Sequence, residues 1–77
     1  MRTMRKITRF AKDNGFKALP GTSIATLSKD NIKFRIMRQA ENKYKLTISK
    51  RGDILTEPSY HTAEEEVIDK IIHFLNQ

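Results

Sequence analysis

The side chains best suited to acid–base chemistry lie near the C-terminal end of the chain, where His61 precedes a run of glutamates. This histidine could exchange a proton with the help of a nearby carboxylate, namely Glu57, Glu64 or Glu65. We interpret His61 instead as a residue that precedes a helix, and the glutamates as groups that favour the positive end of the helix dipole. The sequence has no glycine-rich phosphate loop and no nucleophile elbow. We therefore expect a protein that is not an enzyme.

Metal binding has equally little support from residue spacing. His61 and His73 are the two histidines, and they lack the i, i+4 spacing of a helical ligand pair. The chain has no cysteine, which removes thiolate ligands and fits a reducing compartment. Its apolar runs are a few residues long, far short of the roughly 20 residues that span a bilayer. We expect no metal, no cofactor and no membrane association, and we expect a cytoplasmic location.

Charge is the strongest feature of the sequence. The 77 residues are enough for a single compact domain over 1–77, and they contain 15 Lys and Arg against 9 Asp and Glu, a net charge of +6. Residues 1–51 hold 14 of the basic and 3 of the acidic side chains, whereas residues 52–77 hold 1 and 6. This division indicates a surface for an anionic partner, with the acidic part turned away from that surface or bracing it. We expect the binding surface to lie before Gly52, and the final helix to be scaffold.

The first part of the chain has the apolar spacing of an amphipathic helix over residues 3–14. Its buried face would consist of Met4, Ile7, Phe10 and Ala11. Gly15 supplies the left-handed residue that ends a helix, and Phe16 can fold back onto the last turn. The opposite face carries basic residues, here named the helix stripe: Arg2, Arg5, Arg9 and Lys12. Basic residues near a helix N-terminus oppose its dipole, so we expect the helix stripe to serve binding rather than helix stability.

Two segments, 32–38 and 43–50, alternate apolar and polar residues as half-buried strands do. Matching their apolar sets in an antiparallel pair sets Ile36 opposite Tyr44 or Leu46, with a loop of three or five residues unless a bulge intervenes. The outward positions bring together four basic residues, here named the cationic sheet face: Lys33, Arg35, Lys43 and Lys45. Like charges across a strand pair repel, so such a cluster indicates a function.

Two further strands are expected beside this pair. A two-residue turn at Lys29-Asp30 would set the segment 22–28 against the first strand, with Leu27 opposite Ile32 and Ala25 opposite Phe34, and with Ile24 facing outward. After the pair, a turn at Arg51-Gly52 would set Leu55 opposite Ile48, in an edge strand that stops before Pro58. We expect Tyr60 to pack beside the last helix.

The last segment predicts a helix over residues 63–75. Thr62 and Glu65 have the spacing of a capping box, and a wide apolar stripe follows. The whole order is helix, three or four strands, helix. Since each element has one apolar face, we expect a small α+β domain of the form α-β-β-β-(β)-α, an antiparallel meander sheet with both helices packed on one face.

The element order resembles the double-stranded-RNA-binding fold, but the basic start of that family's final helix is absent here, where residues 62–66 read Thr-Ala-Glu-Glu-Glu. A three-stranded sheet backed by a C-terminal helix also resembles the arm-site DNA-binding domain of tyrosine recombinases, in which the sheet enters the major groove. That resemblance implies that the cationic sheet face would contact DNA.

These features favour a small basic, non-enzymatic module that contacts nucleic-acid phosphates with little base specificity. The expected outer sheet face has no aromatic residue on which a base could stack, so a duplex is favoured over a single strand. The alternative is a protein-interaction module, such as an inhibitor of phage or mobile-element type that resembles anti-restriction or anti-CRISPR proteins. Such an inhibitor would dock on an acidic or nucleic-acid-handling host protein.

Overall fold

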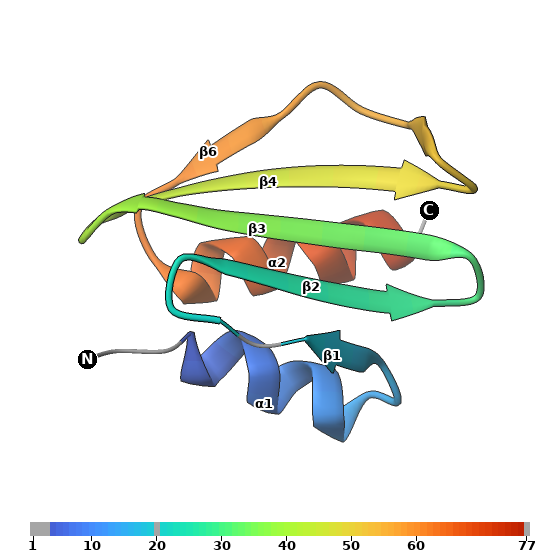
Figure 1. Cartoon of the computed structure of the whole chain (residues 1–77), viewed down its shortest axis with the longest axis horizontal. Helices are drawn as coiled ribbons and strands as arrows, with labels where there is room; N and C mark the ends of the chain where they lie inside the picture. Colours follow the sequence, from blue (N-terminus) through green and yellow to red (C-terminus); the bar gives the residue numbers. More distant parts are fainter. Residues whose placement is uncertain (1–3, 20, 77) are drawn as a thin grey trace.

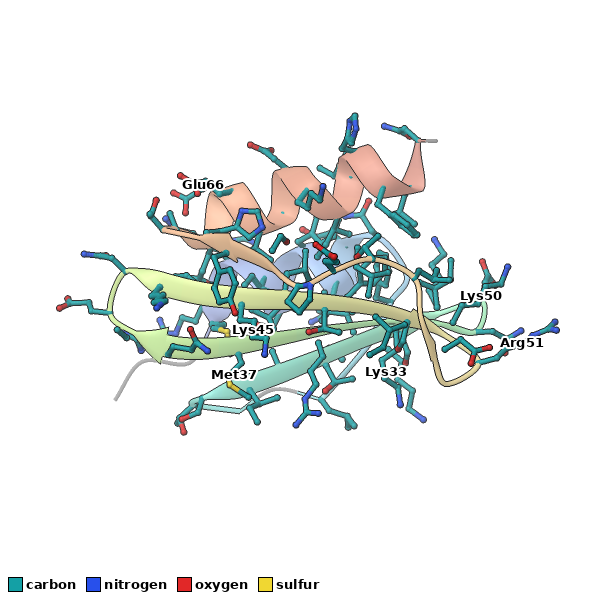
Figure 2. The ribbon with its side chains drawn as sticks, turned by 90° about the horizontal axis from the view of Figure 1, so that it is seen from above. Lys33, Met37, Lys45, Lys50, Arg51 and Glu66 are labelled. Atoms are coloured by element: carbon teal, nitrogen blue, oxygen red, sulfur yellow. The ribbon has the colours of Figure 1, made fainter. Side chains whose placement is uncertain are left out.

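Two helices and six strands make up the computed structural model, which describes residues 4–19 and 21–76 (Figure 1). The elements follow one another as α1 (Arg5–Asp13), β1 (Lys17–Leu19), β2 (Ile24–Lys29), β3 (Ile32–Ala40), β4 (Lys43–Lys50), β5 (Asp53–Ile54), β6 (Ser59–His61) and α2 (Glu64–Leu75). The strands form one antiparallel sheet in the order β1-β2-β3-β4-β5. The sixth strand, β6, also pairs with β4, at the other end of the edge that β5 occupies. Both helices lie on the same side of the sheet (Figures 1 and 2). The α+β architecture expected from the sequence is confirmed.

The core lies between the sheet and the two helices. Alternate residues of the three long strands are buried there, namely Ala25, Leu27, Phe34, Ile36, Tyr44, Leu46 and Ile48. The helices contribute Ile7 and Ala11 from α1 and Val67 and Ile71 from α2. Phe34 holds the layers together, because its ring meets Phe16 and Phe74 edge to face at centroid distances of 5.8 and 5.9 Å. Within the described residues, neither helix is long and apolar enough to cross a membrane.

The end of α1 has the form that the sequence predicts. Gly15 has a φ of +76°, and the backbone N–H of Phe16 donates to the carbonyl oxygen of Ala11 at 2.8 Å. Phe16 folds back onto the helix, with its ring centroid 5.7 Å from that of Phe10. The helix itself, Arg5–Asp13, is shorter at both ends than the predicted 3–14.

The register between β2 and β3 differs from the prediction by two residues. Leu27 lies opposite Phe34, and Ala25 opposite Ile36, because the turn is made by Asp30-Asn31 rather than by Lys29-Asp30. Asp30 and Asn31 have φ values of 53° and 71°, the left-handed conformation that a tight hairpin turn requires and that Asp and Asn tolerate well. A shift of two residues leaves every side chain on its predicted face, so Ile24 still faces outward opposite Met37.

Of the two pairings that the sequence allows between β3 and β4, the structure has the one with Leu46, and it contains a bulge. Ile36 lies opposite Leu46, and the register shifts between Arg38 and Ala40. The extra residue lets the chain turn through the two residues Glu41 and Asn42. Because Tyr44 points into the core, its neighbour Lys43 points to the other side of the sheet, as predicted.

The second edge of the sheet is split into two short strands. Arg51 and Gly52, with φ values of 52° and 87°, form the predicted turn, and the backbone N–H of Leu55 donates to the Ile48 carbonyl at 2.9 Å. The chain then returns after Pro58 as β6, a strand that the sequence did not predict. In β6, Tyr60 lies opposite Lys45 and is 58% exposed, so the expectation that it packs beside the last helix is wrong.

The start of α2 is one residue later than predicted, and the predicted capping box of Thr62 and Glu65 is not formed, because the N-cap residue is Ala63 and no side chain caps it. The backbone N–H of Thr62 donates to Glu66 Oε1 at 3.0 Å, and the Thr62 hydroxyl donates to Glu66 Oε2 at 2.8 Å. The predicted partner, Glu65, bonds instead to Lys6 of α1. Because α1 lies next to this first turn, tertiary contact overrides the local spacing.

Candidate nucleic-acid interface

The sheet face that points away from the helices, here named the open face, carries the residues that the sequence singles out. Residues directly opposite each other in an antiparallel sheet point to the same side. Three cross-strand rows follow from the strand pairings: Ile24, Met37, Lys45 and Tyr60; Leu19, Thr26, Arg35 and Thr47; Lys17, Ser28, Lys33, Ser49 and Ile54. Figure 2 shows Lys33, Met37 and Lys45 on the side of the sheet opposite α2. The cationic sheet face is therefore part of the open face.

Each cation of the cationic sheet face has neutral neighbours across the sheet. Lys33 lies between Ser28 and Ser49, and Arg35 lies between Thr26 and Thr47. Lys45 lies between Met37 and Tyr60. The expected repulsion between directly opposed charges is thus avoided, because no two cations face each other in these rows. The three rows also contain no acidic side chain, so no cation in them has a carboxylate as its cross-strand partner.

Lys43 and Tyr60 extend the open face at the end where β4 begins. The Lys43 Nζ lies 5.7 Å from the centroid of the Tyr60 ring, within the range of a cation–π contact. This contact places an exposed aromatic ring among the basic residues of the open face. The expectation of an outer sheet face without an aromatic residue is wrong, since it did not include β6.

The helix stripe forms a second basic surface that is separate from the open face. Arg5, Arg9 and Lys12 are exposed and line a shallow depression on α1 together with Thr8 and Asp13. Arg2 lies outside the described residues. Since α1 packs on the covered side of the sheet, its outward surface and the open face do not form one plane. One flat partner cannot contact both.

The acidic residues at the start of α2 brace the start of α1. Glu64 Oε1 accepts hydrogen bonds from the backbone N–H groups of Lys6 and Ile7, at 3.1 and 3.3 Å. Lys6 Nζ lies 2.9 Å from Glu65 Oε2. This hydrogen bond holds the pKa of the Glu65 carboxyl below its usual value and raises the pKa of Lys6. The pKa of Glu66 is also lowered, first by the backbone N–H of Thr62 and then by its hydroxyl.

His61 is engaged in a local network that joins β6 to α2. The Ser59 Oγ and His61 Nε2 lie 2.8 Å apart, and His61 Nδ1 lies 3.9 Å from Glu66 Oε1. A serine, a histidine and a carboxylate in this order also occur in hydrolases. Here the histidine–carboxylate distance exceeds that of a hydrogen bond, and both Glu66 oxygens already accept from Thr62. The network therefore explains how the strand end is fixed to the helix.

A wider open depression lies between the starts of both helices and the β3–β4 turn. Arg5, Arg38, Tyr44 and Glu64 are among the residues that line it, and its lining includes neither Ser59 nor His61. Within the described part of the chain, no three His, Asp or Glu side chains are grouped as ligands of a metal ion would be.

Lys17 and Tyr60 are among the open-face residues that were missed at the level of sequence. Each lies in a strand of three residues, which leaves little room for a periodicity of two. For Lys17 a weak signal existed, because Phe16 and Ala18 flank it as apolar residues flank a polar one in a strand. For Tyr60 no local signal existed, since Pro58 and the helix cap suggested a connecting loop.

Comparison of the chain with models of protein families, with curated proteins and with solved structures finds no match.

Proposed function

We propose that this protein is a small non-enzymatic nucleic-acid-binding module whose open face contacts phosphate groups with little base specificity. The observation that carries the proposal is the composition of the three cross-strand rows, which contain cations and no carboxylate, and in two of which Ser or Thr flanks the central cation. Lys and Arg provide charge for phosphate oxygens, and Ser and Thr hydroxyls provide further hydrogen bonds to them. A nucleic-acid partner also fits the proposed cytoplasmic location.

The open face fits this role better than the helix stripe does. In the rows of the open face, Lys33, Arg35 and Lys45 lie on adjacent strands and are fixed by the pairing of β3 with β4. Residues two apart on one strand, such as Lys33 and Arg35, are about 6.6 Å apart along the strand and point to the same side. The helix stripe is a single row on one element, and the carboxylate of Asp13 lies beside it.

Two matched triple variants test the proposal. The first, Lys33→Ala, Arg35→Ala and Lys45→Ala, removes three charges from the open face. The second, Arg5→Ala, Arg9→Ala and Lys12→Ala, removes three charges from the helix stripe, so both variants lower the net charge of +6 equally. We expect the first to bind fluorescently labelled DNA at least about tenfold more weakly, and the slope of log affinity against log salt to become shallower by about 2 to 3. The second should bind like the unchanged protein.

The titrations are made by fluorescence anisotropy between about 50 and 200 mM salt, with thermal melts of each variant as the folding control. If the helix-stripe variant loses binding and the open-face variant keeps it, the assignment of the surface is wrong. If the unchanged protein binds neither single-stranded nor duplex DNA or RNA at low salt, the nucleic-acid proposal as a whole is wrong.

The second candidate function is docking on a host protein. It is favoured by two exposed aliphatic side chains on the open face, Leu19 of β1 and Ile54 of β5, which are 64% and 69% exposed. Apolar side chains beside a charged surface are typical of protein interfaces. Absence of nucleic-acid binding, with capture of an acidic or nucleic-acid-handling protein that is lost on Leu19→Ser and Ile54→Ser, would favour this function over the first.

A further inference from the structure

Tyr60 is an exposed aromatic residue in a basic setting. In β6, Ser59 and His61 lie opposite the core residues Leu46 and Tyr44 and point toward α2, so Tyr60 points to the open face. The residue is 58% exposed although its side chain is large and aromatic. The sheet therefore presents an aromatic surface to solvent at the edge of its positively charged side.

Two lysines lie close to this ring, one across the strand pair and the other over the ring. Lys45 lies directly opposite Tyr60, which places their Cβ atoms about 5 Å apart. Lys43 Nζ lies 5.7 Å from the ring centroid. Beyond Lys45 in the same row lie the half-buried apolar residues Met37 and Ile24. An aromatic ring and two ammonium groups are thus combined at one end of the open face.

We propose that Tyr60 stacks on an unpaired base of single-stranded nucleic acid, while Lys43 and Lys45 hold the phosphates next to that base. The inference rests on the proposed function and specifies its ligand. Sheets that bind single strands place bases on exposed aromatic rings and guide the backbone with basic residues. In a duplex, the faces of internal bases are covered by their neighbours, so the ring would find a base to stack on only at an end. Contact with duplex phosphates would use only the phenol hydroxyl of Tyr60 and would leave the faces of its ring without a partner.

The test compares a labelled single-stranded DNA of about 12 nucleotides with an abasic strand of the same length, which keeps the phosphates and lacks the bases. We expect the base-containing strand to bind about 5-fold to 150-fold more tightly than the abasic one to the unchanged protein. In Tyr60→Ala this ratio should fall close to one, and in Tyr60→Phe it should be retained. Ile54→Ala, which removes another exposed apolar side chain of the open face, should leave the ratio unchanged.

Intrinsic fluorescence supplies an independent readout. The chain has no Trp and two Tyr, and Tyr44 is buried in the core. Stacking of a base on Tyr60 should therefore quench the tyrosine emission on titration with unlabelled single strand. This quenching should disappear in Tyr60→Phe, although that variant still binds.

The outcomes separate the stacking from the underlying function. If Tyr60→Ala keeps the ratio of affinities for the base-containing and abasic strands, while the open-face triple variant loses affinity for both, the stacking proposal is wrong. The proposal of phosphate binding then stands. A duplex that binds more tightly than the single strand, with no effect of Tyr60→Ala, would likewise overturn the stacking. Failure of the unchanged protein to bind any strand would contradict both. If Tyr60→Ala melts at a markedly lower temperature, Tyr60→Leu, which keeps apolar bulk in the same cross-strand pair, replaces it.

Discussion

Glu64 shows how one carboxylate can compensate a feature that the sequence leaves unfavourable. The residue that precedes α1 is Met4, whose side chain makes no capping hydrogen bond, and the first turn of α1 contains Arg5 and Lys6 but no acidic residue. Glu64 Oε1 from α2 accepts from the backbone N–H groups of Lys6 and Ile7 instead. The carboxylate therefore acts as an N-cap supplied by another element, and its charge offsets the basic residues at the positive end of the dipole.

At the scale of single residues, we expect Glu64→Ala to lower the free energy of unfolding by about 0.5 to 2 kcal/mol, the typical cost of losing an N-cap. Glu65→Ala is the matched control, because it removes a neighbouring carboxylate from the same turn of α2 and loses an exposed ion pair of small value. Urea denaturation followed by circular dichroism measures both. Equal destabilisation by the two variants would argue against a capping role of Glu64.

At the scale of elements, the hairpins are set by turn conformation as much as by apolar pattern. The β2–β3 turn places both Asp30 and Asn31 at positive φ, and the β4–β5 turn does the same with Arg51 and Gly52. A glycine marks the second turn plainly in the sequence. The first turn has no glycine, and this explains why its position was predicted one residue too early.

The positive φ of Asn31 predicts the effect of replacing this residue. Asn31→Ala should lower the free energy of unfolding by about 1 kcal/mol, because a Cβ without the local hydrogen bonding of Asn is costly in the left-handed region. Asn42→Ala in the β3–β4 turn should have a smaller effect, since Asn42 is not one of the described residues with a positive φ. Chemical denaturation of the two variants provides the comparison. A larger loss for Asn42→Ala would mean that side-chain contacts, not φ, dominate these turns.

At the scale of the whole molecule, the acidic and basic parts of the chain have distinct places. Glu64 and Glu65 of α2 contact the start of α1, on the covered side of the sheet. The open face, by contrast, has cations without carboxylates in its cross-strand rows. The sheet thus separates the contacts of Glu64 and Glu65 with α1 from the open face, whose cross-strand rows hold cations and no carboxylate. The acidic segment braces the basic one, one of the two arrangements that the sequence suggested.

The carboxylates at the start of α2 predict how the stability of the fold depends on pH. The pKa values of Glu65 and Glu66 are lower in the folded protein than their ordinary value, so both carboxylates stabilise the fold above that value. This stabilisation is lost as the pH falls through their folded pKa values, that is, below about pH 4.3. We expect the melting temperature to fall on acidification in this range. In Glu66→Gln the fall should be less steep, and an unchanged pH profile of that variant would contradict the assignment.

Local patterns in the sequence were enough to predict the two helices, the long strands and the side of the sheet on which each of their residues lies. These features are local, because a periodicity of 3.6 or 2 is written into a continuous segment. Lys33, Arg35, Lys43 and Lys45 could be assigned to one face for this reason, and a register error of two residues between β2 and β3 did not alter their side.

Contacts between residues far apart in the chain could be found only in the folded structure. Tyr60 joined the open face because β6, after a break at Pro58, pairs with the start of β4. Glu64 caps α1 from 57 and 58 residues away along the chain. The helix stripe and the cationic sheet face are equally basic in the sequence, yet they came to lie on different sides of the sheet. Such placements depend on how apolar faces are buried together, and that burial is a property of the whole chain, which no single segment encodes.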